Sequence, residues 1–248
     1  MRVAITGLGV ISCLGNDLDT VSGALRQGRS GIVVDEERTR LGFRSSLTGV
    51  VRDYDPRVYV SRKQIKSMGQ PAQYAVGAAV QAIDSARLRR DVLREEGTGV
   101  IVGNDSCALP VVEAVDAVRE HHQTRHIGSG NIIQVMSSTV TMNLSTYFGI
   151  RGASWTVSGA CASGAHAIGQ AYLLIKSGLQ ETVLCGGAQE INWQGMASFD
   201  ALGAFARDGG EPARASRPFD RDRTGLVPSG GSAMLVLERL DRAIERDA

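Results

Sequence analysis

Short apolar runs rich in Val, Ile and Leu recur along the chain and end close to glycines. They occupy residues 3–6, 100–103, 155–158, 183–186 and 234–237. An uninterrupted apolar run suits a strand that is covered on both faces, so we expect buried strands at these places. Helical patterns lie between the runs, at residues 19–26, 72–88, 111–122, 138–148 and 162–176. Strands that alternate with helices predict an α/β fold, with a mostly parallel mixed sheet layered between α-helices.

Two further stretches add detail to the predicted fold. The helix predicted at 72–88 carries five alanines on its small-residue face, which would allow close approach to a sheet or another helix. Residues 207–232 are rich in Gly, Arg, Asp and Pro and show no periodicity. They predict a long surface excursion before the last strand, and such excursions are often functional.

Length and charge narrow the class of protein. The 248 residues suit one large α/β domain or two small ones. Lys and Arg number 27 against 26 Asp and Glu, so no overall field favours a nucleic-acid or membrane-surface partner. No apolar run reaches membrane-spanning length, and the first fourteen residues lack a signal-peptide cleavage pattern. We therefore expect a cytoplasmic globular protein.

The four cysteines do not form a recognisable framework. They are Cys13, Cys107, Cys161 and Cys185, with no CxxC pair and no histidine at ligand spacing. This pattern predicts neither a disulfide scaffold nor a zinc site, and it favours a reducing compartment.

Cys161 lies where a strand pattern changes into a helix pattern. The β-rich run at 155–158 is followed by Gly159 and Ala160, and an alanine-rich helix begins directly after the cysteine. Unpaired amides and the positive end of the helix dipole favour a thiolate there, and the same amides could bind the oxygen of an acyl group. The alternative is a small buried hydrophobe, the commoner fate of a free cysteine. The local residues leave both interpretations open.

The histidines are weaker candidates for a catalytic base. His166 lies five positions beyond Cys161, about 140° around a helix axis, so we expect it to point elsewhere as a hydrogen-bonded structural histidine. His121, His122 and His126 occupy a polar helix-to-loop stretch and are interpreted as surface residues.

Several segments share their order with one known family. They are residues 6–12 (Thr-Gly-Leu-Gly-Val-Ile-Ser), 28–32 (Gly-Arg-Ser-Gly-Ile), 185–190 (Cys-Gly-Gly-Ala-Gln-Glu) and 216–227, together with the turn at Cys161. This set resembles the N-terminal half of the type I/II β-ketoacyl-acyl-carrier-protein synthases, which are condensing enzymes of the thiolase fold. One departure is Pro228-Ser229-Gly230-Gly231, where many members have a Gly-Glu-Gly-like turn.

The resemblance implies one thiolase-like N-terminal ketosynthase domain over residues 1–248. It implies that Cys161 takes an acyl chain from a carrier protein, and that malonyl-carrier protein then loses carbon dioxide and its carbanion attacks the thioester. The pathway would be fatty-acid or polyketide synthesis, and no organic or metal cofactor is expected. The Gly7-Leu8-Gly9 turn lacks the third glycine and the acidic residue of a dinucleotide fingerprint.

The resemblance also assigns residues around the nucleophile. Phe199 and Met136 match positions that line the acyl pocket, and Ser106 and Cys107 fall where pocket depth is set. Ordinary core packing is the alternative for all four.

A basic cluster supplies the expected partner surface. Arg62, Lys63 and Lys66 lie close together, and the two lysines match a patch that docks the acidic acyl-carrier protein in the family. A solvated helix face is the alternative.

Members of the family have a second half of similar fold, and its catalytic histidines and lysine have no counterpart in these residues. We therefore expect a fragment, an isolated domain or one piece of a split enzyme, which would need a C-terminal ketosynthase half for condensation. The resemblance also implies a homodimer or heterodimer through the strand near Trp155.

Two other functions stay open. One is a thiolase-fold condensing enzyme that uses coenzyme A thioesters. The other is a noncatalytic acyl-binding subunit of a heterodimeric ketosynthase, akin to a chain-length factor. The basic cluster favours the carrier-protein branch, and the presence of Cys161 argues against a noncatalytic subunit.

Overall fold

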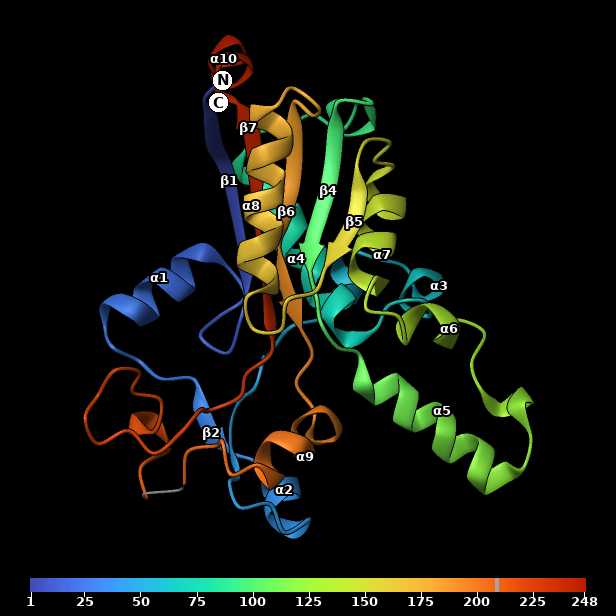
Figure 1. The fold of residues 1–248 in the computed structure, drawn as a ribbon, viewed down its shortest axis with the longest axis vertical. Coiled ribbons are helices and arrows are strands. Elements are labelled where there is room, and N and C mark those ends of the chain that lie inside the picture. The colour runs from blue at the N-terminus through green and yellow to red at the C-terminus, as the bar shows by residue number, and fades with distance from the viewer. Residues whose placement is uncertain (208–209) are drawn as a thin grey trace.

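The protein is built around one mixed five-stranded sheet (Figure 1). The computed structural model describes residues 1–207 and 210–248. In spatial order the strands are β1 (Val3–Ile11), β7 (Gly231–Arg239), β6 (Thr182–Gln189), β4 (Thr98–Gly103) and β5 (Ser154–Val157). The pairs β4–β5 and β4–β6 are parallel, whereas β7 is antiparallel to both β1 and β6. Within this sheet β7 alone runs against the other strands, so the mostly parallel mixed sheet expected from the sequence is confirmed.

Helices cover the sheet on two faces. Helices α4 (Gln70–Ser85) and α7 (Thr139–Phe148) lie on one face, and α8 (Ser163–Lys176) lies on the other (Figure 1). Side chains of β4 alternate between the two cores: Val100 and Val102 pack with α4, and Ile101 packs with α8. This period of two is what a strand buried on both faces requires.

The alanine face predicted at 72–88 packs directly against β1. A Cβ atom at Gly7 would lie 2.0 Å from the carbonyl oxygen of Ala82, and one at Gly9 would lie 1.9 Å from that of Ala78. Glycine on the strand and alanine on the helix are therefore both needed for this close approach.

The remaining elements extend from the two ends of the sheet. They are α1 (Leu18–Arg26), β2 (Ile32–Val34), α2 (Glu36–Arg40), β3 (Leu47–Gly49), α3 (Arg62–Ile65), α5 (Ala108–His121), α6 (Asn131–Gln134), α9 (Trp193–Ala201) and α10 (Leu240–Glu245), with short 3₁₀ turns at Pro56–Val58, Val92–Arg94, Thr124–His126 and Pro212–Arg214. Strands β2 and β3 form a separate antiparallel hairpin. The surface excursion predicted at 207–232 is confirmed for its described residues as far as Gly230, whereas Gly231 and Ser232 already belong to β7. Positions 208–209 of that prediction lie outside the described residues.

Two strand predictions need correction for burial. The run at 155–158 was expected to be covered on both faces, but β5 is an edge strand and Trp155 is 42% exposed. In the run at 3–6, on β1, Ile5 is 60% exposed. Further along β1, Gly7 and Gly9 face α4, and Leu8 between them is exposed on the opposite side. That side of the sheet is covered only in part by α8 (Figure 1).

None of the helices in the described part of the chain is long and apolar enough to cross a membrane.

Candidate active site

Cys161 lies on the tight turn that joins β5 to α8, two positions before the helix begins. Ala160 has φ 49°, in the left-handed region that few residues other than glycine adopt. The hydroxyl of Ser163 braces this conformation, because it accepts from the Gly159 amide at 2.8 Å and donates to the Ala160 carbonyl at 2.6 Å. The predicted position of Cys161 beside a helix N-terminus is confirmed.

Glycines allow the start of α8 to sit against the ends of β4 and β6. A Cβ atom at Gly103 would lie 2.2 Å from the carbonyl carbon of Ser163, and one at Gly164 would lie 3.4 Å from the Cα atom of Gly187. The turn is therefore held at the carboxyl ends of parallel strands, where α/β proteins usually place their sites.

The amides of the turn differ from expectation. Those of Ala162 and Ser163 donate to the carbonyls of Gly159 and Ala160, at 3.1 and 3.0 Å. They satisfy the turn itself and are not free to bind an acyl oxygen. The amides of Ala160 and Cys161 have no acceptor among the described residues, so these two are the candidate donors to an acyl oxygen at this turn.

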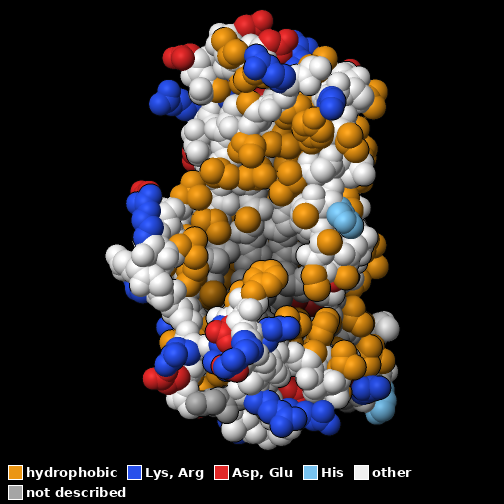
Figure 2. Space-filling view, turned by 60° about the vertical axis from the view of Figure 1, so that its left-hand side comes forward, with side chains coloured by type: hydrophobic (Ala, Val, Ile, Leu, Met, Phe, Trp, Pro, Cys, Tyr) orange, Lys and Arg blue, Asp and Glu red, His pale blue; other side chains and the backbone are white. Residues whose placement is uncertain are grey.

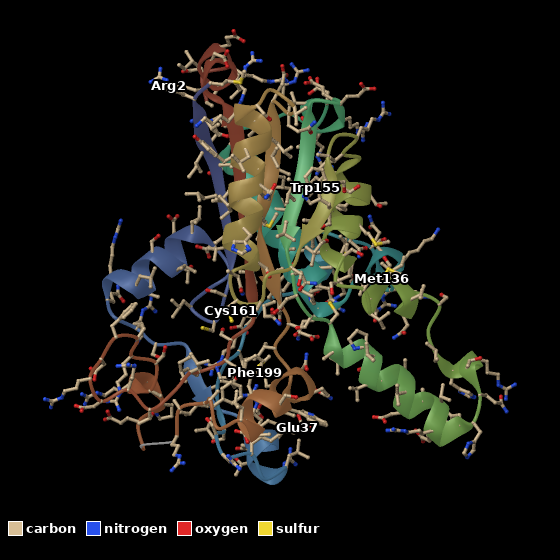
Figure 3. The ribbon with its side chains drawn as sticks, in the orientation of Figure 1. Arg2, Glu37, Met136, Trp155, Cys161 and Phe199 are labelled. Atoms are coloured by element: carbon tan, nitrogen blue, oxygen red, sulfur yellow. The ribbon has the colours of Figure 1, made fainter. Side chains whose placement is uncertain are left out.

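Cys161 is exposed and lines a cavity of about 670 Å³, whose lining residues come from the ends of several strands. Its apolar wall includes Met196, Phe199, Phe205, Leu226 and Val227, and its polar wall includes Asn104, Asp105, Ser106 and Gln189. In Figure 3, Phe199 lies below Cys161, towards α9. The alternative of a cysteine sealed in apolar packing is wrong, because the thiol is accessible.

The four expected pocket residues separate into two groups. Ser106 and Phe199 line the cavity with Cys161, and the Phe199 ring stacks on that of Phe205 with centroids 6.0 Å apart. Met136 and Cys107 are not among its lining residues. Met136 lies near α6, well to one side of Cys161 (Figure 3). Cys107 is buried at the start of α5, directly after Ser106.

Burial separates the chemistry of the other cysteines from that of Cys161. Desolvation raises the pKa of Cys107 to about 11, and the charges of Glu190 and Asp105 add to this shift against a hydrogen bond from Asn104. Desolvation raises the pKa of Cys185 to about 12. Both thiols stay protonated at neutral pH and are poor nucleophiles.

His166 is exposed on α8, and its ring packs against Gly159. A Cβ atom at Gly159 would lie 2.7 Å from Nδ1 of this ring. The expectation of a hydrogen-bonded histidine is wrong, because its side chain has no hydrogen bond among the described residues.

Three residues that the sequence interpretation did not select hold the site together. The buried Glu190 carboxylate accepts from the amides of Ala108 and Leu109, at 2.5 and 3.5 Å, and so caps the start of α5. The neighbouring Gln189 donates from Nε2 to the Ser106 hydroxyl at 3.1 Å. The third residue is Ser163, on the turn. Polar residues directly after a buried strand were the available signal for Gln189 and Glu190.

The basic cluster of Arg62, Lys63 and Lys66 is exposed on α3 and its C-cap. None of the three forms an ion pair with a carboxylate in the described part of the chain. Their charge is therefore available to a partner.

Comparisons with known proteins agree with this architecture. The family model described as "Beta-ketoacyl synthase, N-terminal domain" matches residues 1–243. The chain belongs to the β-ketoacyl synthase family. It is 38% identical to the 3-oxoacyl-[acyl-carrier-protein] synthase 1 of Haemophilus influenzae and 36% identical to that of Escherichia coli K12. Each alignment covers 100% of this chain and 61% of the relative, so the chain spans about three fifths of their length.

Solved ketosynthase structures share the fold. A β-ketoacyl synthase from Burkholderia phymatum superimposes with a TM-score of 0.91 at 32% identity, over 100% of this chain and 61% of that one. The ishigamide ketosynthase/chain length factor gives 0.90 at 29% identity, over 100% and 60%. The thiolase-like half predicted from the sequence is confirmed.

Proposed function

We propose that this chain is the acyl-accepting half of a β-ketoacyl-acyl-carrier-protein synthase. The observation that carries the proposal is an exposed Cys161 on a braced turn that opens into a cavity with an apolar wall. A thiol that is reachable, rather than buried, can act as a nucleophile.

The proposed first step transfers an acyl group between two sulfur atoms. The Cys161 thiolate attacks the thioester carbonyl of an acyl-carrier protein, and the amide of Cys161 donates to the developing oxyanion. The bond from the carbonyl carbon to the carrier sulfur then breaks. The carrier leaves as a thiolate and takes up the proton that Cys161 lost. The acyl group is then bound to Cys161 as a thioester, with its hydrocarbon tail against the apolar wall.

The proposed second step needs groups that the described residues do not supply. Malonyl-carrier protein loses carbon dioxide, its carbanion attacks the carbonyl carbon, and Cys161 leaves as a thiolate. In the resembling family the histidines that assist this step belong to the C-terminal half. About two fifths of each relative's length lies outside the part that this chain matches, so we propose that such a half completes the enzyme.

A surface suited to that second half lies over α8 and β1. Leu8, Tyr172 and Leu173 are 44%, 40% and 54% exposed, and Figure 2 shows hydrophobic side chains spread over this side of the molecule. A large apolar surface of this kind usually marks an interface. Helix α8 begins two residues after Cys161, so a partner on this surface would lie beside the cavity.

Two further partners belong to the proposal. The unpaired charges of Arg62, Lys63 and Lys66 suit an acidic acyl-carrier protein. The edge strand β5, with Trp155 exposed, suits strand pairing with a second ketosynthase chain. Among structural neighbours, one is described as a type II polyketide synthase carrier protein in complex with its ketosynthase, at 27% identity and a TM-score of 0.87.

The pathway is proposed as fatty-acid or polyketide synthesis, since relatives of both kinds match the chain. We propose the cytoplasm as its compartment, because the four cysteines are all unpaired.

Intact-mass measurement tests the acyl transfer. The chain is incubated with decanoyl-carrier protein, and we expect one decanoyl adduct on the parent and none on Cys161→Ala. Decanoyl-coenzyme A offered at the same concentration should react more slowly, because it lacks the acidic carrier surface. Absence of an adduct, or an adduct that survives in Cys161→Ala, would refute the assignment.

A further inference from the structure

The cavity beside Cys161 has hydroxyl groups whose hydrogens are already committed. Ser163 donates to Ala160, Ser229 donates to the Gly49 carbonyl at 3.1 Å, and Ser232 donates to the Gly187 carbonyl at 2.9 Å. These serines hold backbone segments together. Their donors are not available to a bound chain.

The pair formed by Ser106 and Gln189 is different. Gln189 donates from Nε2 to the Ser106 oxygen at 3.1 Å, and neither side chain forms another hydrogen bond within the described residues. The Ser106 hydroxyl hydrogen, the second Nε2 hydrogen of Gln189 and the Gln189 Oε1 acceptor therefore have no partner among the described residues. Both side chains are half-buried and line the same cavity as Cys161.

The backbone around this pair is fixed. Glu190 follows Gln189 and binds the amides of Ala108 and Leu109, two and three residues after Ser106. Asn104, two residues before Ser106, donates to the Ser137 carbonyl at 2.7 Å. The two ends of the Ser106 loop are held, so the pair cannot easily turn away to find other partners.

A saturated acyl chain would cover this pair without satisfying it. Burying a donor and an acceptor against methylene groups removes their hydrogen bonds to water and supplies no new hydrogen bonds. Sites with such groups discriminate against ligands that lack the matching oxygen. A hydroxyl group can bind both side chains, because its oxygen can accept from the Ser106 hydroxyl while its hydrogen is donated to Gln189 Oε1. The neighbouring Asp105 is exposed, so water solvates its carboxylate and a chain need not satisfy it.

We propose that Ser106 and Gln189 form a subsite for a hydroxyl group on the acyl chain, so that the cavity takes hydroxyacyl chains in preference to unsubstituted ones. This inference rests on the proposed acyl transfer to Cys161 and narrows its substrate class. It makes Gln189 a specificity-determining residue.

The test is a competition read by intact mass. The chain is offered equal amounts of decanoyl-carrier protein and of a decanoyl-carrier protein hydroxylated at carbon 3, 5, 7 or 9, one position per reaction. We expect at least one hydroxylated donor to exceed decanoyl by about threefold or more, the effect of one to two hydrogen bonds. Ser106→Ala and Gln189→Leu should each bring that ratio close to one. Ser106→Thr keeps the hydroxyl and should keep the preference.

The controls separate this inference from the acyl transfer itself. Ser85→Ala removes an exposed hydroxyl at the end of α4 and should leave the ratio unchanged. If decanoyl adducts form on Cys161 but no hydroxylated position is preferred, the subsite is refuted while the proposed function stands. A preference that persists in both Ser106→Ala and Gln189→Leu also refutes it. If no donor of any kind labels Cys161, the proposed function fails first.

Discussion

At the scale of single residues, the four cysteines have the same side chain in four environments. Cys161 is exposed on its turn, whereas Cys107 and Cys185 are buried, and burial raises their pKa values to about 11 and about 12. A raised pKa keeps a thiol protonated as the pH rises, and only the thiolate attacks an alkylating agent. Burial adds a second barrier, since the reagent reaches a buried sulfur only slowly.

This contrast predicts the order of alkylation by iodoacetamide. At pH 8, peptide mass analysis should find Cys161 labelled well before Cys107 and Cys185. Raising the pH towards 11 should expose Cys107 to labelling, because its thiolate then forms. Labelling of Cys107 at pH 8 as fast as Cys161 would contradict the burial that the structure gives it. Guanidinium-unfolded protein serves as the control, in which these three thiols should react alike.

The brace at the turn supports a second prediction. Ser163→Ala removes both hydrogen bonds that hold Ala160 at positive φ, so the turn should relax and Cys161 should lose its fixed position. We expect acylation of Cys161 to slow by about 3- to 30-fold, the equivalent of one or two hydrogen bonds. Ser163→Thr retains the hydroxyl and should recover most of the rate. Equal melting temperatures with equal acylation rates for all three proteins would show that the brace has no role.

Residue identity alone predicted only part of the site. Cys161 could be identified because a strand pattern, small residues and a helix pattern meet there. The positive end of the helix dipole favours a thiolate at that position. The pairing of Gln189 with Ser106 joins residues 83 positions apart in the sequence. No local pattern encodes such a contact. For the same reason Met136 was placed at the pocket by resemblance, although it lies outside the cavity that contains Cys161.

At the scale of elements, packing of α8 on the sheet decides where the nucleophile lies. The helix approaches β4 so closely that Gly103 has no room for a Cβ atom, which would lie 2.2 Å from backbone atoms of Ser163. Backbone cannot move aside as a flexible side chain can. The position of Cys161 thus depends on a glycine in a strand 58 residues earlier.

Gly103→Ala should therefore displace the start of α8. We expect a loss of about 1–3 kcal/mol in the free energy of unfolding, as for other overpacked sites, and a larger loss of Cys161 acylation. The matched control is Gly169→Ala on α8, where a Cβ atom meets nothing within 4 Å. Alanine there should be neutral or stabilise the protein by up to about 1 kcal/mol. Urea unfolding of both variants measures the difference, and equal stabilities would contradict the close packing.

Element prediction succeeded where the periodicity was long. The helices α4, α7 and α8 and the strands of the central sheet carry apolar patterns that identify them from the sequence. The hairpin of β2 and β3 was missed because each strand has three residues, too few to show alternation. Its position also depends on the distant loop, where Ser229 donates to the Gly49 carbonyl. Contacts of this kind are invisible to local patterns.

At the scale of the whole molecule, the two faces of the sheet are not equally covered. The face under α4 and α7 holds the larger buried cluster, whereas the face under α8 has a smaller one and leaves apolar side chains in solvent. A helix layer needs apolar residues on both sides only when something packs on its outer surface. The outer surface of α8 therefore has the composition of an interface rather than of a solvated helix.

The chain on its own should associate through this surface. Double substitution of Leu8→Lys and Leu173→Lys places two charges on the apolar surface formed by β1 and α8. We expect less self-association by sedimentation velocity and weaker binding of an apolar dye, with the melting temperature nearly unchanged because both side chains are already exposed. Val58→Lys is the matched control, since Val58 is 76% exposed at a 3₁₀ turn remote from α8. Its dye binding and association should match those of the parent. A parent chain that stays monomeric and binds no dye would contradict the interface. That result would mean that exposing this surface to water carries no free-energy penalty.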